Sequence, residues 1–378
     1  MPAVRLTDVA QDAGVSLATA SRVLNGSARV PGKAVAERVE ASARRLGYVP
    51  NAQAQALARS RSGLIGLVVH DISDPYFATL ARAMQQQLFD SNSQVLLTQT
   101  NRDLDTEVRA IRSLVSQQVD ALVLVGSHRY GDESDTAIRT LLEGFVRNGG
   151  KVVGLGQSLG VGRTIVPDNA AAAHELATSL IVEGHRRFAV VEGIAGIPSA
   201  GDRTGGFVAA LTEAGIEPEL NLQADLTRTG GHRLAEGIAA HLTAAEQDDA
   251  PLCVFAPADV MALGALGELR RRGLDVPGQV AVAGFGGVPG SADSHPTLTT
   301  IALPLDDMAR RAIQWVLEDA SPREVAPGDE AAGDEAAGDA AGRTAAVDAA
   351  TGDRAQTAEV HVRGEVRLRE STALTAAS

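Results

Sequence analysis

Apolar residues follow two different spacings along this chain, and the change falls near residue 63. Before it, short segments carry the spacing of amphipathic helices, as at Leu6, Val9, Ala10 and Ala13. Beyond it, apolar runs of strand length alternate with helical patterns. The runs occupy residues 64–69, 94–98, 121–125, 152–155, 188–191, 252–256 and 280–284. The helical patterns occupy residues 77–88, 104–118, 134–148, 170–184, 203–214, 230–245 and 258–272.

This alternation predicts parallel sheets covered by helices on both faces. About 250 residues is large for a single sheet of this kind, so we expect two lobes. Ligands of such folds bind beyond the carboxyl ends of the strands. The strand ends are therefore the place to look for a binding site.

The first 49 residues predict three short helices. The first begins at residue 6 or 7 and ends at Gly14, because glycine is favoured where a helix terminates. Ser16 can cap the second helix, which Gly26 ends. The third helix lies between Pro31 and Gly47.

The chain is thus expected to divide into a head at 1–49, a linker with a very short helix at 50–62, and a two-lobed body at 63–378. Residues 323–358 interrupt the body with an acidic low-complexity repeat that has no bulky apolar side chain apart from Val347. Such a segment cannot offset the entropy cost of ordering, so we expect a disordered loop. An alternating strand pattern resumes at Val360, Val362, Val366 and Leu368.

Charge is unevenly spread along the chain. Residues 1–62 hold nine Lys/Arg against four Asp/Glu, hence +5, whereas the whole chain carries −13. A small basic head on a large acidic body is expected where only the head meets a polyanion.

Composition narrows the class of protein. The single cysteine, Cys253, excludes an internal disulfide and a Cys-based zinc site, and its apolar neighbours predict a buried core position. No stretch approaches the 18 or more apolar residues of a membrane span. Arg5, Asp8 and Asp12 stand where a signal peptide would need its apolar segment. We therefore expect a soluble cytoplasmic protein with no membrane partner.

The head carries the spacing of a helix-turn-helix. Ala10 is small where two helices cross, Gly14 makes the turn, and Ser16 caps the second helix. That helix can lie in a major groove with its first residues directed at base edges. A plain helical hairpin shares this spacing, so spacing alone leaves DNA binding open.

A longer set of residues resembles the lactose-repressor/galactose-repressor (LacI/GalR) family of bacterial transcription regulators. The matching stretches run in order through the chain: Asp8-Val9-Ala10, Ala13-Gly14-Val15-Ser16, Ser21-Arg22-Val23-Leu24-Asn25, Leu46-Gly47-Tyr48-Val49-Pro50-Asn51, Asp74-Pro75-Tyr76-Phe77, Gly184-His185-Arg186-Arg187, Asp259-Val260-Met261-Ala262 and Leu368-Arg369-Glu370-Ser371-Thr372. The resemblance implies a small all-α helix-turn-helix head joined to an α/β two-lobed, periplasmic-binding-protein-like body with parallel sheets. It also implies an allosteric, homodimeric repressor of transcription that binds a palindromic operator in double-stranded DNA.

The resemblance further implies which residues contact DNA. Leu17 and Ala18 face base edges with apolar contacts, and Arg22 can pair with guanine O6 and N7. Leu57 corresponds to the leucine that opens the central base step in the minor groove and bends the DNA. Phosphate contacts are expected from Thr7, Ser16, Thr19, Ser21, Asn25 and Tyr48, and further contacts from Leu6, Asn51 and Ala54.

In such regulators a small-molecule effector binds between the lobes and rotates the first lobes of a dimer against each other. Three strands are expected to cross between the lobes, near residues 161, 290 and 320. The candidate effector-binding residues are Asp74, Tyr76, Phe77, Ser127, Arg203, Asp259 and Phe285.

Three positions depart from the family pattern. Gly286-Gly287, Ala258 and Gly156-Gln157 stand where the family commonly has hydrogen-bond acceptors. A polyol needs several fixed acceptors, so we expect a sugar derivative or an anionic metabolite, in a pocket that the missing side chains enlarge. Loss of the ligand, with constitutive repression, is the alternative.

Other classes of protein fit the sequence less well. Gly154 to Gly160 follows a strand like a dinucleotide loop, but its third glycine is one place late and the expected acid is missing. The eight histidines show neither metal-ligand spacing nor a partner for a nucleophile, so no enzyme, cofactor or metal site is expected. A free small-molecule binding protein would need an export signal, and an architectural DNA-binding protein would not need a ligand-binding body.

Deleting residues 325–355 should change the free energy of unfolding by about 1 kcal/mol or less, because loop-closure entropy varies slowly with length. Thermal denaturation of the full chain beside the deletion measures this. A collapse of the Tm would show that the acidic segment is structural.

Overall fold

The computed structural model describes residues 4–25, 31–49, 61–91, 93–127, 133–193, 196–244, 250–318 and 358–374. The predicted linker helix at 52–58, with Asn51, Ala54 and Leu57, lies outside these ranges. So does the predicted disordered loop, apart from Ala358, which the structure describes. Within the described part, no helix is both long and apolar enough to cross a membrane.

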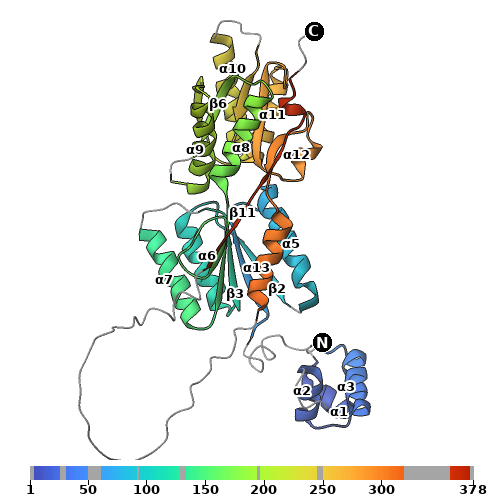
Figure 1. Ribbon diagram of the computed structural model, residues 1–378. Coiled ribbons are helices and arrows are strands. Elements are labelled where there is room, and N and C mark those ends of the chain that lie inside the picture. The colour runs from blue at the N-terminus through green and yellow to red at the C-terminus, as the bar shows by residue number, and fades with distance from the viewer. Residues whose placement is uncertain are drawn as a thin grey trace, which may run out of the picture.

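The head consists of three helices, α1 (Leu6–Asp12), α2 (Leu17–Asn25) and α3 (Lys33–Leu46) (Figure 1). They enclose a small core in which Val9, Ala20 and Val39 are fully buried. Gly14 has φ +64°, and the Ser16 hydroxyl accepts the Thr19 N–H at 3.1 Å. The predicted turn and cap are thereby confirmed.

The first lobe is built on a six-stranded, fully parallel sheet. Its strands, in spatial order, are β11 (Ala358–Val362), β5 (Arg163–Pro167), β4 (Lys151–Leu155), β3 (Ala121–Val125), β1 (Leu64–Val69) and β2 (Gln94–Gln99). Helices α5 (Pro75–Leu88) and α13 (Leu305–Leu317) cover one face; α6 (Leu104–Ser116) and α7 (Glu133–Arg147) cover the other (Figure 1). A single turn of 3-10 helix, Phe89–Ser91, follows α5.

The second lobe has a six-stranded sheet of the same kind. Its strands, in spatial order, are β12 (Glu365–Arg367), β10 (Thr299–Ala302), β9 (Val280–Gly286), β8 (Leu252–Phe255), β6 (Arg187–Glu192) and β7 (Leu220–Gln223). Only β12 is antiparallel to its neighbour. Helices α8 (Asn169–Val182) and α9 (Pro198–Glu213) cover one face, and α10 (Arg228–Ala244) and α11 (Asp259–Arg271) cover the other. The short helices Gly290–Asp293 (α12) and Glu370–Thr372 complete the lobe.

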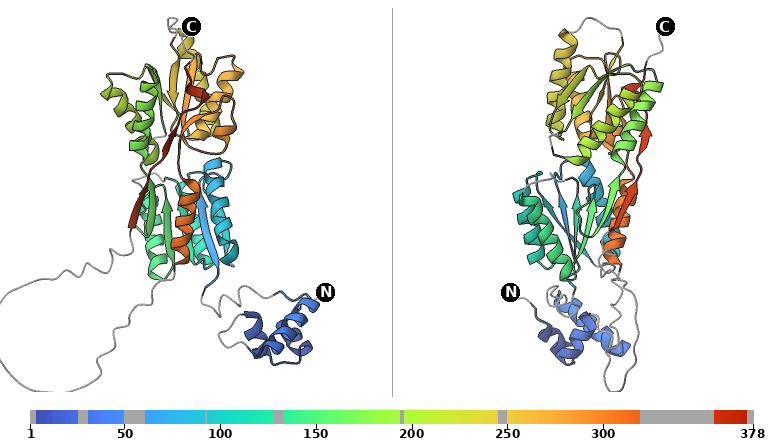
Figure 2. Two further views of the ribbon diagram at one scale, coloured as in Figure 1. Left: turned by 45° about the vertical axis from the view of Figure 1, so that its right-hand side comes forward. Right: turned by 60° about the vertical axis from the view of Figure 1, so that its left-hand side comes forward.

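The chain passes between the lobes three times, as expected, but not where expected (Figure 2). The passages follow β5, β10 and β11, at residues 167–169, 302–305 and 362–365, rather than near 161, 290 and 320. The error arose because the short strands β5 and β10 and helix α13 were not anticipated. Similarly, the alternating pattern after residue 358 is not one strand. It breaks at Gly364 into β11 and β12, which belong to different sheets.

Two neighbouring glycines of α9 give a test of the packing between α8 and α9. A Cβ at Gly206 would lie 2.1 Å from the Ala170 carbonyl oxygen, whereas one at Gly205 would meet nothing within 4 Å. Gly206→Ala should therefore destabilise the protein by about 1–3 kcal/mol through overpacking. Gly205→Ala should stabilise it by about 0.5–1 kcal/mol, because alanine favours helix. Urea unfolding of both variants measures the difference, and equal effects would contradict this packing.

Candidate functional site

The carboxyl ends of strands from both sheets border one cavity between the lobes. All seven predicted effector-binding residues line it: Asp74, Tyr76, Phe77, Ser127, Arg203, Asp259 and Phe285. The cavity is about 60 Å³, far below the 300–1,000 Å³ usual for a small-molecule pocket. A whole sugar therefore requires the lobes to separate or the side chains to rearrange.

Arg203 of α9 lies at the centre of this cleft. Its Nε donates to Asn169 Oδ1 and its Nη1 to the Pro257 carbonyl, both at 2.8 Å. The guanidinium carbon lies 4.0 Å from the centroid of the Phe285 ring, in reach of a cation–π interaction. Burial lowers the pKa of Arg203 to about 10, which still leaves it charged at neutral pH.

Asp259, the first residue of α11, accepts hydrogen bonds from the loop after β9 and from β10. Its Oδ1 accepts the Thr300 hydroxyl at 2.5 Å, and its Oδ2 accepts the Val288 N–H at 3.0 Å. Burial raises the pKa of Asp259 to about 6, although these hydrogen bonds oppose the shift. The carboxylate is thus largely committed to the protein itself.

Asp74 and Tyr76 begin α5 at the first-lobe side of the cleft. Asp74 caps the helix by accepting the Tyr76 N–H at 2.9 Å, and burial raises the pKa of its carboxyl. Burial also raises the pKa of Tyr76 to about 12. The Tyr76 and Phe77 rings meet edge to face with centroids 5.2 Å apart. This side of the cleft therefore offers aromatic surface and one capped carboxylate.

Both polar and apolar side chains are exposed at the start of α2 in the helix-turn-helix. Ser16, Leu17, Ala18 and Arg22 are exposed, and the Ser16 and Thr19 hydroxyls are 2.8 Å apart. Thr7 is also exposed. Leu6 and Tyr48 are instead half-buried and pack against the head core. Ser21 is half-buried, and the side chain of Asn25 lies outside the described part.

Known proteins share both the head and the body. Residues 5–51 match the bacterial regulatory proteins of the lacI family, and residues 177–332 match the periplasmic binding protein-like domain. The HTH-type transcriptional repressor CytR of Escherichia coli is 30% identical over 325 residues, covering 85% of this chain and 92% of CytR. The chain belongs to the LacI family.

Solved structures of LacI-family regulators share the fold of this chain. The Lac repressor dimer bound to operator and the anti-inducer ONPF superposes with a TM-score of 0.73 at 21% identity, covering 98% of this chain and 99% of that one. The complex of the regulator CelR with cellobiose gives 0.61 at 25% identity, covering 97% and 99%. The predicted fold class is confirmed. Members of the LacI family are DNA-binding transcription regulators and not enzymes, so this chain is a regulator of that kind.

One expectation drawn from the LacI-family pattern is wrong for this conformation. The small side chains at Gly286, Gly287 and Ala258 do not leave an enlarged pocket, since the cavity that Gly286 and Ala258 border is small. Gly287 has φ +69°, and a Cβ there would lie 2.5 Å from the Ala302 Cα, so this backbone excludes a side chain. A Cβ at Gly286 would meet Asp259 Oδ2 at an ordinary 3.5 Å, but the φ of +140° there is one that residues with a side chain rarely adopt. The acceptors are thus missing, but the backbone at Gly286 and Gly287 disfavours any side chain and the cavity stays small.

Sequence reasoning missed Arg102, which also lines the cleft. It follows β2 with φ +59°, and its guanidinium carbon lies 5.9 Å from the Phe77 ring centroid. In the first lobe, the predicted candidates follow the first and third strands only. Extending the same rule to the second strand would have found it. Asn169 and Thr300 were missed because they act through Arg203 and Asp259 rather than on the cavity.

Asp259 should make stability pH-dependent in a defined window. Between about pH 4 and pH 6 the folded chain retains a proton that the unfolded chain has released, so the stability this group contributes falls as pH rises and is level above pH 6. Relative to Asp259→Asn, the free energy of unfolding should fall by on the order of 3 kcal/mol across the window. Urea unfolding of both proteins from pH 4 to pH 7 measures it. A constant difference would contradict the buried carboxyl.

Proposed function

We propose that this chain is a homodimeric transcription repressor that binds a palindromic operator and is controlled by a small-molecule effector in the cleft between its lobes. The observation that supports it best is the pairing, in one chain, of an exposed second helix in a helix-turn-helix with a two-lobed cleft lined from both lobes. The head supplies the DNA contact and the body supplies a site whose occupancy can change.

The proposed readout follows from the front of α2. Leu17, half exposed, and Ala18 can contact thymine methyl groups in a major groove. Arg22, one turn later, can donate two hydrogen bonds to a guanine. Hydroxyls at Thr7, Ser16 and Thr19 suit phosphates, which fix the position of the helix without selecting a sequence.

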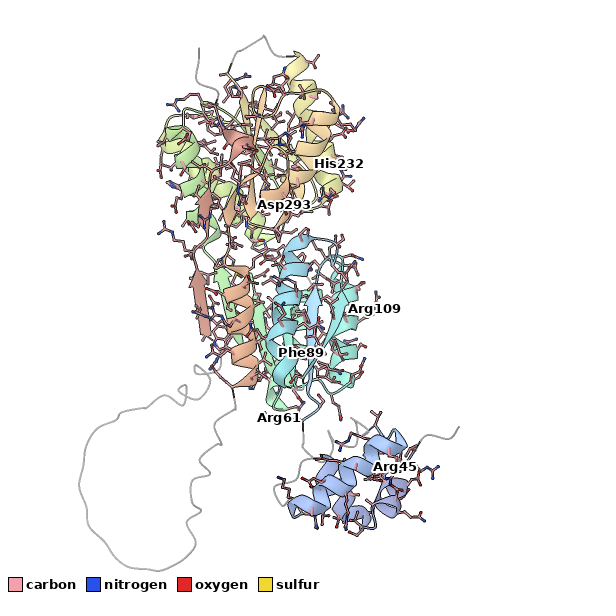
Figure 3. The ribbon with its side chains drawn as sticks, turned by 90° about the vertical axis from the view of Figure 1, so that its right-hand side faces the viewer. Arg45, Arg61, Phe89, Arg109, His232 and Asp293 are labelled. Carbon is pink, nitrogen blue, oxygen red and sulfur yellow. The ribbon has the colours of Figure 1, made fainter. Side chains whose placement is uncertain are left out.

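The proposed dimer uses the free edge of the first sheet. β2 is the last strand there, and large apolar side chains on or beside it are exposed: Ile72 by 53%, Phe89 by 85% and Leu97 by 41%. Figure 3 shows Phe89 on the outside of the first lobe. Burying such residues against a twofold-related copy removes apolar surface from water and pairs two heads for two half-sites.

The proposed control is a shift between two arrangements of the lobes. A ligand favours one arrangement only by the difference between its affinities for the two. Residues from both lobes line the cleft, so the affinity depends on how the lobes sit. A sugar derivative is the proposed class, in keeping with the cellobiose that CelR holds.

Operator binding tests the proposal directly. In gel shifts with the DNA upstream of its own gene, Arg22→Ala should weaken binding by about 1–3 kcal/mol per half-site and relax base preference at one symmetric position. Arg38→Ala, which removes the same charge from an exposed site on α3, should leave base preference unchanged. The same loss of selectivity in both variants would contradict base readout by Arg22.

A charge introduced at Phe89 tests the dimer. Phe89→Asp should raise the dimer dissociation constant at least tenfold, since burying a phenylalanine contributes roughly 1.5–3 kcal/mol. Val182→Asp, at an equally exposed apolar site at the end of α8, should leave the dimer intact. Light scattering over a concentration series measures both. A monomeric wild type, or equal effects of the two variants, would contradict this interface.

A further inference from the structure

The cleft brings a second arginine close to Arg203, from the opposite lobe. Arg102 belongs to the loop between β2 and α6 in the first lobe, and Arg203 belongs to α9 in the second. Both line the same cavity. Arg102 is half-buried, so its charge is partly removed from water.

The two guanidinium groups differ in their partners. Arg203 donates two hydrogen bonds, to Asn169 Oδ1 and to the Pro257 carbonyl. The side chain of Arg102 makes no hydrogen bond to any residue in the described ranges. The Arg102 guanidinium carbon lies 5.9 Å from the Phe77 ring centroid, and the carboxylates of Asp71 and Asp74 act on it through space. A partly desolvated guanidinium that has no acceptor among the described residues gains from an acceptor that a ligand brings.

Charges of both signs act on the two arginines. Burial lowers the pKa of both arginines, and the like charge of Arg102 lowers the pKa of Arg203 further. The carboxylates of Asp71 and Asp74 act on Arg102, and those of Asp259 and Asp202 act on Arg203, in the direction opposite to burial. Asp74 is engaged in capping α5, and Asp259 accepts from Thr300 and Val288. Arg102 is therefore the cleft cation whose guanidinium has no hydrogen-bond acceptor among the described residues.

The absence of acceptor side chains at Gly286 and Ala258 also favours an anionic ligand. Gly286 and Ala258 contribute no polar side chain to the cavity, so a ligand rich in hydroxyl donors finds few partners. A ligand that brings its own acceptor oxygens would match the two arginines, because guanidinium binds carboxylate and phosphate in a bidentate manner. The cavity of about 60 Å³ has room for a group of a few atoms.

We propose that the effector is a small organic anion whose carboxylate or phosphate lies between Arg102 of the first lobe and Arg203 of the second. This rests on the proposed effector-controlled function. The anion neutralises two cations that belong to different lobes, so it holds the lobes together and favours the closed arrangement. Arg102 is thus the residue that selects for charge, while the rings of Tyr76, Phe77 and Phe285 contact the rest of the ligand.

Isothermal titration calorimetry of the full chain with matched ligands tests the proposal. The probes are glucose, gluconate and glucose 6-phosphate, then ribose and ribose 5-phosphate, with inorganic phosphate as the bare anion. At least one anion should bind at least tenfold more tightly than its neutral counterpart. Gluconate and the sugar phosphates distinguish a carboxylate ligand from a phosphate ligand. Equal or tighter binding of the neutral sugars, or no binding of any anion, would overturn the proposal.

Variants of Arg102 locate the charge. Arg102→Gln should raise the Kd of the preferred anion at least tenfold and leave neutral sugars unaffected, while Arg102→Lys should fall between it and wild type. Arg109→Gln is the matched control, because Arg109 points outward from α6 in the same lobe and bonds only Thr106 among the described residues (Figure 3). Arg203 is unsuitable, since its loss would also free Asn169 and Pro257. Anion binding that Arg102→Gln leaves unchanged would overturn the proposal.

Two further measurements distinguish unfolding from loss of anion binding, and the proposed effector from the proposed DNA-binding function. Melting curves without ligand show whether Arg102→Gln is folded, and if it is not, Arg102→Lys carries the comparison. Gel shifts test operator binding separately. A protein that binds anions through Arg102 but no operator would refute the proposed function and leave the arginine pair standing. A protein that binds operator but discriminates against anions would do the reverse.

Discussion

The structure of the body depends on one covalent constraint: the chain passes between two parallel sheets three times. Two of these passages also lie side by side. Asp168, after β5, donates its N–H to the Val362 carbonyl at 2.9 Å, and its Oδ1 lies 2.8 Å from His361 Nδ1. The lobes can rotate and open about such connections, but the ends of their strands stay facing one another. The carboxyl ends of strands from both sheets therefore always border the same cleft.

Desolvation governs what that cleft can do. Burial shifts the pKa of Arg203 and Arg102 downward and that of Asp74 and Asp259 upward, so every ionised group there is less favourable than in water. The protein satisfies most of these groups internally, through helix capping, a carbonyl and a threonine hydroxyl. What remains unsatisfied defines the ligand. The ligand is expected to supply acceptors for the donors that the protein itself leaves without a partner.

The head follows different rules from the body. Its core is a handful of small side chains around Val9 and Val39, and its turn and cap involve residues only a few positions apart. Because the core does not need the first residues of α2, their side chains remain exposed and can enter the major groove of DNA. The second helix can present Leu17 and Arg22 because the buried face of α2 is supplied by Ala20 and by half-buried Val23.

The sequence alone determined the features that depend on near neighbours. The helix-turn-helix, the cap at Ser16 and the long strands of both sheets were predictable, because period and capping are local properties. The seven cleft residues were predictable from the resemblance to the LacI family, and Arg203, which lies within α9, from that alone. Strands β5 and β10 were not, since each is short and exists only through pairing with a neighbouring strand. The split of residues 358–367 between two sheets was likewise invisible in an alternating pattern. The size of the pocket and the pairing of Arg102 with Arg203 were decided by tertiary structure, because they depend on how residues about 100 positions apart pack once both sheets have formed.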